Sequence, residues 1–145
     1  MLITPDAGTV KTGKPRPVPI HTHLVEMGLL NYVAAVEARV GKQAPLFYSP
    51  PPRPSRNPNY RGPAVKTSER LAKWVRGLGV TDPDIRPNHA WRHVFKTRAS
   101  RAKIEARLRD AICGHAARTT ADDYEHPTPE DMAEALKHFP RYEVE

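Results

Sequence analysis

The chain has 145 residues, of which 39% are apolar, and its 23 Lys and Arg residues against 16 Asp and Glu give a net charge of +7. This length suits one domain with a single modest core. No stretch reaches the roughly 18 apolar residues of a membrane span, and the N-terminus lacks a signal-peptide pattern, so we expect a cytoplasmic protein without membrane contact. The single cysteine, Cys113, excludes an intrachain disulfide and a multi-cysteine zinc site. The basic excess favours a polyanionic partner, because neutralised phosphates release counterions; a basic solvated surface without a partner is the plain alternative.

The N-terminal third of the sequence predicts one small β element followed by a helix. Residues 1–20 have the pattern of a β-hairpin around Thr12-Gly13-Lys14, and prolines in its second half predict an edge strand. Apolar positions over residues 22–40 recur at helical spacing and end at Gly41, so we expect one amphipathic helix there. Residues 44–48 are a short apolar run that could form a buried strand or an extended segment.

Prolines dominate residues 49–65, which therefore predict a long loop. Its arginines and Tyr60 could follow a nucleic-acid backbone, its prolines could bind another protein module, or it could be an inert surface loop.

The remaining sequence predicts helices over residues 67–78, 87–100, 104–113 and 128–137, and a short helix that carries Tyr124. We expect Trp74 in the core and Cys113 as a small buried residue at a helix end. The fold class is thus mainly α, with a small N-terminal β-hairpin and a mostly helical stretch over residues 22–140.

Arg92 and His93 lie three and four positions after His89, so the three residues share a helix face. Two histidines at this spacing could bind zinc, but Ala90 stands where a zinc protease has its glutamate, and we expect no metal. This helix face could also be a solvent-exposed polar surface without a function. Arginine is well suited to bidentate binding of phosphate oxygens, which gives Arg92 a function if a phosphate lies nearby.

Gly114-His115 precedes Tyr124, which lies nine residues after the histidine. A phenol has a pKa of roughly 10, so it needs a proton acceptor and a positive potential to act as a nucleophile at neutral pH. A histidine can accept the proton, and an arginine can provide the positive potential. A surface tyrosine without a function is the alternative.

Four motifs follow one another over residues 9–140. They are Lys11-Thr12-Gly13-Lys14-Pro15-Arg16-Pro17-Val18-Pro19, His89-Ala90-Trp91-Arg92-His93, Cys113-Gly114-His115, and Thr119-Thr120 before Tyr124. In this order and spacing they resemble the catalytic domain of the tyrosine recombinases, the phage integrase family. That family has a lysine-bearing β-hairpin, a His-x-x-Arg motif followed by a further histidine, a Leu-Gly-His segment, and a tyrosine nine residues later.

The resemblance implies site-specific DNA cleavage and rejoining without a cofactor or a metal. Tyr124 would attack a DNA phosphate and form a 3′-phosphotyrosyl link. Arg92 would stabilise charge on the non-bridging oxygens, and His115 would bond a phosphate oxygen. His89 would assist with the proton of the tyrosine, and Lys11 would be the general acid for the leaving 5′-oxygen.

The resemblance also implies partners. Double-stranded DNA would contact further residues beside the catalytic ones, namely Lys14, Arg16, His93 and Arg118. The last helix, within residues 128–139, would dock on a neighbouring copy and so form a homo-oligomer on DNA.

The sequence departs from the family in three respects. The first catalytic arginine of the family lies in a helix before the hairpin, and the DNA-clamping domain precedes that helix; we expect neither within residues 1–145. Arg16, Arg53 and Arg56 are not in the sequence context of that arginine. Cys113 stands where the family has leucine. We therefore expect residues 1–145 to be a single, partial catalytic domain from the C-terminal part of an integrase, such as one from a prophage. A DNA-binding remnant without catalysis and a type IB topoisomerase-like enzyme are the alternatives.

Overall fold

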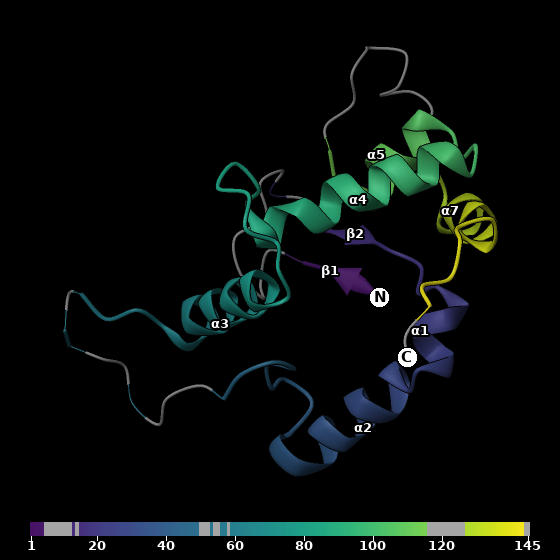
Figure 1. The fold of residues 1–145 in the computed structure, drawn as a ribbon. Coiled ribbons are helices and arrows are strands. Elements are labelled where there is room, and N and C mark those ends of the chain that lie inside the picture. The colour runs from purple at the N-terminus through teal and green to yellow at the C-terminus, as the bar shows by residue number, and fades with distance from the viewer. Residues whose placement is uncertain are drawn as a thin grey trace. The chain divides into compact units, whose positions relative to one another are not determined.

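The computed structural model describes residues 1–4, 13, 15–49, 53, 56–57, 59–115 and 127–143. These residues form a two-stranded antiparallel sheet and six helices, so the described part of the chain is mainly α with an N-terminal hairpin, as predicted (Figure 1). The elements are β1 (Leu2–Ile3), β2 (Arg16–Pro17), α1 (Thr22–Glu26), α2 (Leu29–Val40), α3 (Pro63–Gly77), α4 (Pro87–Arg101), α5 (Ala106–Cys113) and α7 (Pro129–Lys137). Over the described ranges, none of the helices combines the length and the apolar character needed to cross a membrane.

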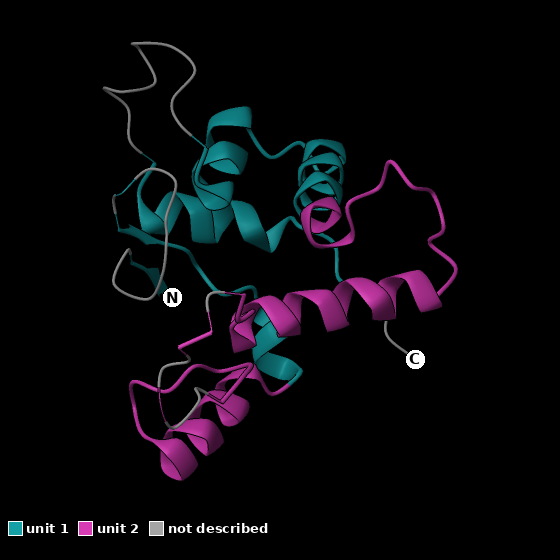
Figure 2. Cartoon of the chain, turned by 90° about the vertical axis from the view of Figure 1, so that its left-hand side faces the viewer, with its two compact units in different colours: residues 1–27, 92–145 teal, residues 28–91 magenta. Residues whose placement is uncertain are grey.

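The chain divides into two compact units (Figure 2). Unit 1 comprises Met1–Met27 and Arg92–Glu145, and unit 2 comprises Gly28–Trp91. The boundary falls within α4, so the first turns of that helix belong to unit 2 and the rest to unit 1.

The N-terminal hairpin pairs Leu2 with Pro17 and Ile3 with Arg16. The N–H of Val18 donates to the carbonyl of Met1 at 2.7 Å and extends the pairing by one step. Each strand has only two residues, because proline has no N–H to donate to the ladder.

The single helix predicted over residues 22–40 is wrong, because the chain forms two helices there. α1 ends at Met27, and Gly28 then adopts a left-handed conformation with a φ of 88° before α2 begins. A left-handed residue cannot continue a right-handed helix, and glycine adopts this conformation without a clash of its own Cβ. The stop predicted at Gly41 is confirmed as the C-cap of α2.

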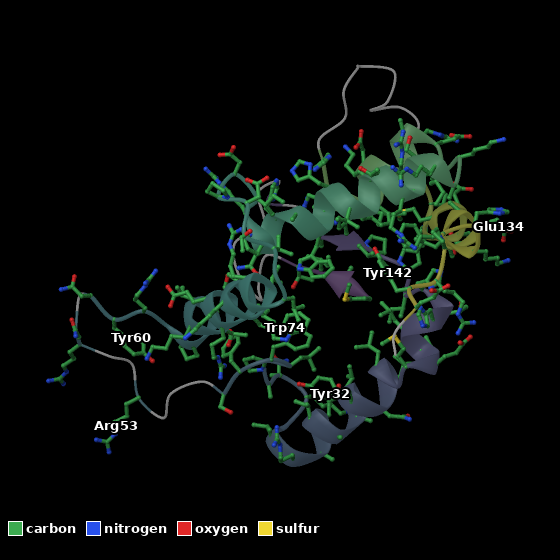
Figure 3. All side chains as sticks on the ribbon, viewed as in Figure 1. Tyr32, Arg53, Tyr60, Trp74, Glu134 and Tyr142 are labelled. Atoms are coloured by element: carbon green, nitrogen blue, oxygen red, sulfur yellow. The ribbon has the colours of Figure 1, made fainter. Side chains whose placement is uncertain are left out.

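Three further predictions, all for residues of unit 2, differ from the structure. Residues 44–48 form bends and irregular backbone instead of a strand, and the hydroxyl of Tyr32 donates to the carbonyl of Leu46 in this segment. Helix α3 begins at Pro63, earlier than predicted, because proline suits the first turn of a helix. Trp74, which we expected in the core, is 57% exposed on α3 (Figure 3).

The core of unit 1 lies where α4, α5 and α7 meet. Its buried members are Ala99, Ile104, Leu108, Met132, Leu136 and Phe139. The ring of Phe95 stacks on that of Phe139 with the centroids 5.1 Å apart. This packing fixes α5 against α4, and the end of α5 is where the candidate site forms.

Helix α7 starts with a capping box. The N–H of Asp131 donates to the hydroxyl of Thr128 at 3.1 Å, and the N–H of Thr128 donates to the Asp131 carboxylate at 3.0 Å. Two N–H groups that the helix itself cannot satisfy thus gain partners. The prediction of a helix that starts near residue 128 is confirmed.

Candidate functional site

The candidate site forms around the C-terminal end of α5, within unit 1. Gly114 has a φ of 68°, and its N–H donates to the carbonyl of Ala111 at 3.0 Å. The N–H of His115 donates to the carbonyl of Asp110 at 2.9 Å. These two bonds close the helix through a left-handed glycine and fix the position at which His115 leaves it.

Two arginines from distant parts of the sequence meet at this helix end. Arg92 of α4 donates from Nη1 to the carbonyl oxygen of Cys113 at 2.5 Å. Arg16 of β2 donates from Nη2 to the same oxygen at 3.5 Å. A Cβ atom at Gly114 would overlap the guanidinium of Arg16, so residue 114 must lack a side chain for Arg16 to lie there. The predicted partners Arg92 and His115 are thus brought to one place, and Arg16 joins them.

Beside the arginines, three side chains form a compact polar cluster. The Lys96 ammonium lies 2.7 Å from Oδ1 of Asp110 and 3.2 Å from Nδ1 of His115. Oδ1 of Asp110 also lies 3.2 Å from Nδ1 of His115. The side chain of Asp110 is only 10% exposed, whereas that of His115 is 37% exposed. The carboxylate of Asp110 is therefore mostly buried, and the imidazole of His115 is partly exposed to solvent.

The charge at this end of α5 favours an anion. Three cationic side chains lie at this helix end, those of Arg16 and Arg92 at the Cys113 carbonyl and that of Lys96 at the carboxylate of Asp110, which is the one carboxylate among these contacts. The buried Nε of Arg16 has no hydrogen-bond partner among the described residues. An unsatisfied buried donor is costly, and an oxygen of a bound phosphate is the kind of acceptor that it lacks.

Cys113 lies close to these charged side chains. Burial raises the pKa of its thiol, while the positive charges of Arg92 and Lys96 oppose the shift. The net pKa is above the ordinary value of 9.0, so the thiol stays protonated at neutral pH and is a poor nucleophile. The prediction that Cys113 is a small buried residue at a helix end is confirmed, since it is 8% exposed and ends α5.

The structure places His89 in the first turn of α4, on the unit 2 side of the boundary, and His93 next to Arg92 on the unit 1 side. In the described ranges, no group of three histidine, cysteine or acidic side chains could hold a metal ion.

Four predicted site residues, Lys11, Lys14, Arg118 and Tyr124, lie outside the described residues. The described part of the site therefore ends at His115, nine positions before Tyr124 in the sequence.

Two residues of the site were missed from the sequence, Lys96 and Asp110. Lys96 follows Arg92 by four residues and so lies on the same helix face, which is a usable signal. Asp110 carries no comparable signal, because its contact with Lys96 depends on how α4 packs against α5.

A hollow of about 540 Å³ within unit 2 lies between α3, the first turns of α4 and the segment that holds Phe47. Its walls are mostly apolar and include the exposed rings of Trp74 and Trp91. None of the predicted site residues lines it.

Searches against protein families, curated proteins and solved structures found no match to this chain.

Proposed function

We propose that this chain carries the catalytic residues of a tyrosine recombinase other than the first arginine of the family, and that such an enzyme cleaves and rejoins double-stranded DNA through a 3′-phosphotyrosyl link at Tyr124. One observation carries the proposal. Arg16 and Arg92 meet at the carbonyl of Cys113 beside His115, and Tyr124 follows that histidine by nine residues.

The two guanidinium groups act on the phosphate. Each guanidinium has five N–H donors in a rigid fork, and the carbonyl of Cys113 occupies only part of this capacity. The remaining donors of Arg92 and Arg16 bond the non-bridging oxygens, where negative charge grows as the phosphorus becomes five-coordinate. Donors held in place before the reaction stabilise such charge by roughly 3–4 kcal/mol each in comparable enzymes.

The reaction is a transesterification that conserves the phosphodiester bond energy. The phenolic oxygen of Tyr124 bonds to phosphorus, and the bond from phosphorus to the 5′-oxygen breaks. His89 assists in removing the proton from the phenol, and Lys11 gives a proton to the leaving 5′-oxygen. Rejoining is the reverse, with the 5′-hydroxyl as the nucleophile.

Covalent trapping tests the proposal. The whole chain is incubated with duplex DNA that carries bridging phosphorothiolates, whose 5′-thiol leaving group cannot religate efficiently, and a denaturing gel shows any protein–DNA adduct. We expect an adduct with the unmodified chain and with Tyr142→Phe, and none with Tyr124→Phe. Tyr142 is a suitable control because it is a partly exposed tyrosine of the same unit.

The absence of an adduct, with DNA still retained on a filter, would overturn catalysis and favour a DNA-binding protein without turnover. Relaxation of a supercoiled plasmid that has no paired sites would instead indicate a topoisomerase. Oligomerisation through the last helix stays a prediction, because Met132 and Leu136 of α7 pack within their own chain in the structure.

A further inference from the structure

We propose that Asp110 is a positioning residue that keeps Nδ1 of His115 protonated, so that Nε2 is the ring nitrogen that exchanges a proton in the phosphate site. The function of Nε2 at a phosphate depends on the proposed recombinase function. The tautomer of His115 does not depend on it.

The three polar atoms of the cluster allow two hydrogen-bond arrangements. In the first, Lys96 and the Nδ1–H of His115 both donate to Oδ1 of Asp110, over 2.7 Å and 3.2 Å. In the second, Lys96 donates to both Asp110 and an unprotonated Nδ1, over 2.7 Å and 3.2 Å. The two arrangements put the proton of the neutral ring on opposite nitrogens.

Burial favours the first arrangement. The carboxylate of Asp110 is the least exposed of the three side chains, at 10%, and a buried anion is stabilised by each donor that reaches it. In the second arrangement, the carboxylate oxygen and the lone pair of Nδ1 would face each other at 3.2 Å. Both atoms would be acceptors, so this contact is unfavourable. The first arrangement also has one unfavourable contact, because the Lys96 ammonium and the Nδ1–H are both donors 3.2 Å apart, but there both groups donate to the buried carboxylate.

Lys96 has a separate function in this arrangement. Its ammonium compensates the charge of Asp110 at 2.7 Å, so the carboxylate can remain ionised and buried. Arg109 of α5 donates to the backbone carbonyl of Lys96 at 3.4 Å and helps to hold this part of α4 in place. Asp110 and Lys96 together therefore fix the orientation of the imidazole from the inner side.

The consequence for His115 is that its two nitrogens have different functions. Nδ1 is bound to the carboxylate in both charge states of the ring, whereas Nε2, across the ring, has no hydrogen bond to the described residues and can bind a ligand. A neutral ring can accept a proton at Nε2, and the protonated ring can then donate it to a phosphate or leaving-group oxygen. His115 thus exchanges protons at the phosphate as well as binding it.

Nitrogen NMR of the whole chain, labelled with 15N-histidine, tests the tautomer directly. Spectra are recorded without DNA, at a pH at which the ring is neutral, and the variant His115→Gln identifies the signals. We expect a protonated Nδ1 in the unmodified chain and in Lys96→Met, because Asp110 still accepts from His115 in both. A neutral ring protonated at Nε2 in the unmodified chain would overturn the proposal, whatever any variant does.

Asp110→Ala provides the converse result. It leaves Lys96 as the partner of Nδ1, so we expect the proton to move to Nε2; an unchanged tautomer would also overturn the proposal. Glu134→Ala is the matched control, since it removes an exposed carboxylate paired with Lys137 on α7 and should leave the His115 signals unchanged.

Adduct formation on phosphorothiolate DNA tests the function of the tautomer. We expect Asp110→Ala to slow it roughly 10–100-fold, as removal of an orienting partner commonly does, without weakening DNA retention. An unchanged rate would overturn the proton-exchange function of Nε2. If the unmodified chain forms no adduct at all, the recombinase proposal fails, and the NMR result alone decides whether Asp110 sets the tautomer.

Discussion

The guanidinium of Arg92 donates to the carbonyl oxygen of Cys113 at 2.5 Å and so ties α4 to the last residue of α5. A bond from a charged donor to a partly buried carbonyl contributes roughly 1.5–3 kcal/mol. Arg92 therefore has a structural function as well as the proposed one, and a test of its chemistry must separate the two.

Arg92→Lys separates the structural function from the proposed catalytic one, because lysine retains the positive charge but lacks the five N–H donors of the guanidinium. We expect the rate of adduct formation to fall about 10²–10³-fold, because one ammonium cannot serve the Cys113 carbonyl and two phosphate oxygens together. Single-turnover trapping on phosphorothiolate DNA measures the rate. Arg101→Lys, at the exposed end of the same helix, is the control and should react at the unmodified rate. Equal rates for both variants would contradict the assignment of Arg92.

The second prediction concerns the close approach of Arg16 to Gly114. Gly114→Ala should destabilise the chain by more than the roughly 1–2 kcal/mol of a left-handed alanine, because its Cβ would also overlap the guanidinium of Arg16. Gly13→Ala is the control in unit 1: its φ of 65° is similar, and no described atom lies within 4 Å of its Cβ. Urea unfolding measures each cost.

A double-mutant cycle then isolates the overlap. Arg16→Ala combined with Gly114→Ala should recover the part of the cost that exceeds the Gly13→Ala value. If the two substitutions are simply additive, the contact between Arg16 and Gly114 is not what makes glycine necessary there.

The third prediction concerns the capping box of α7 and its pH dependence. Hydrogen bonds with Thr128 hold the pKa of Asp131 below its ordinary value of 3.8. A carboxyl whose pKa is lowered on folding stabilises the fold above the unfolded pKa, and this contribution is lost as the pH falls through the folded value. We therefore expect the difference in stability between the unmodified chain and Asp131→Asn to decrease as the pH falls below about 4, and to disappear only below the lowered pKa of the folded state.

Urea titrations from pH 2.5 to 7 measure this difference. Thr128→Ala should cost about 1 kcal/mol at neutral pH, as other N-cap threonines do. Glu130→Gln removes a charge from the same turn but leaves the capping bonds, so it controls for net charge. A difference for Asp131→Asn that stays constant over the whole pH range would contradict the capping explanation.

The fourth prediction concerns the core of unit 1. Met132 is 3% exposed in the cluster formed by α4, α5 and α7, so Met132→Ala should destabilise the chain by roughly 2–5 kcal/mol. Leu24→Ala is the control, because Leu24 of the same unit is 46% exposed and should cost much less. Similar losses for the two variants, measured by urea unfolding, would show that the core does not depend on α7.

The local elements of this chain were largely predictable. The spacing of apolar residues located α4, α5 and α7, and Pro87, Thr128 and Gly114 marked helix ends, because caps and left-handed residues act over a few neighbouring positions. The break at Gly28 was missed because apolar periodicity continues across it. Trp74 was misplaced because periodicity indicates which face of a helix is apolar and does not indicate whether anything covers that face.

The sequence by itself determined the helical class, the N-terminal hairpin, and the order of Arg92 and His115 before Tyr124. Only the tertiary structure decided which groups meet. The contacts of Arg16 with Cys113 and of Lys96 with Asp110 join residues 97 and 14 positions apart. Such contacts depend on the packing of separate elements, and no local propensity specifies them. The meeting of the two arginines at Cys113 and the contacts among Lys96, Asp110 and His115 are thus products of folding.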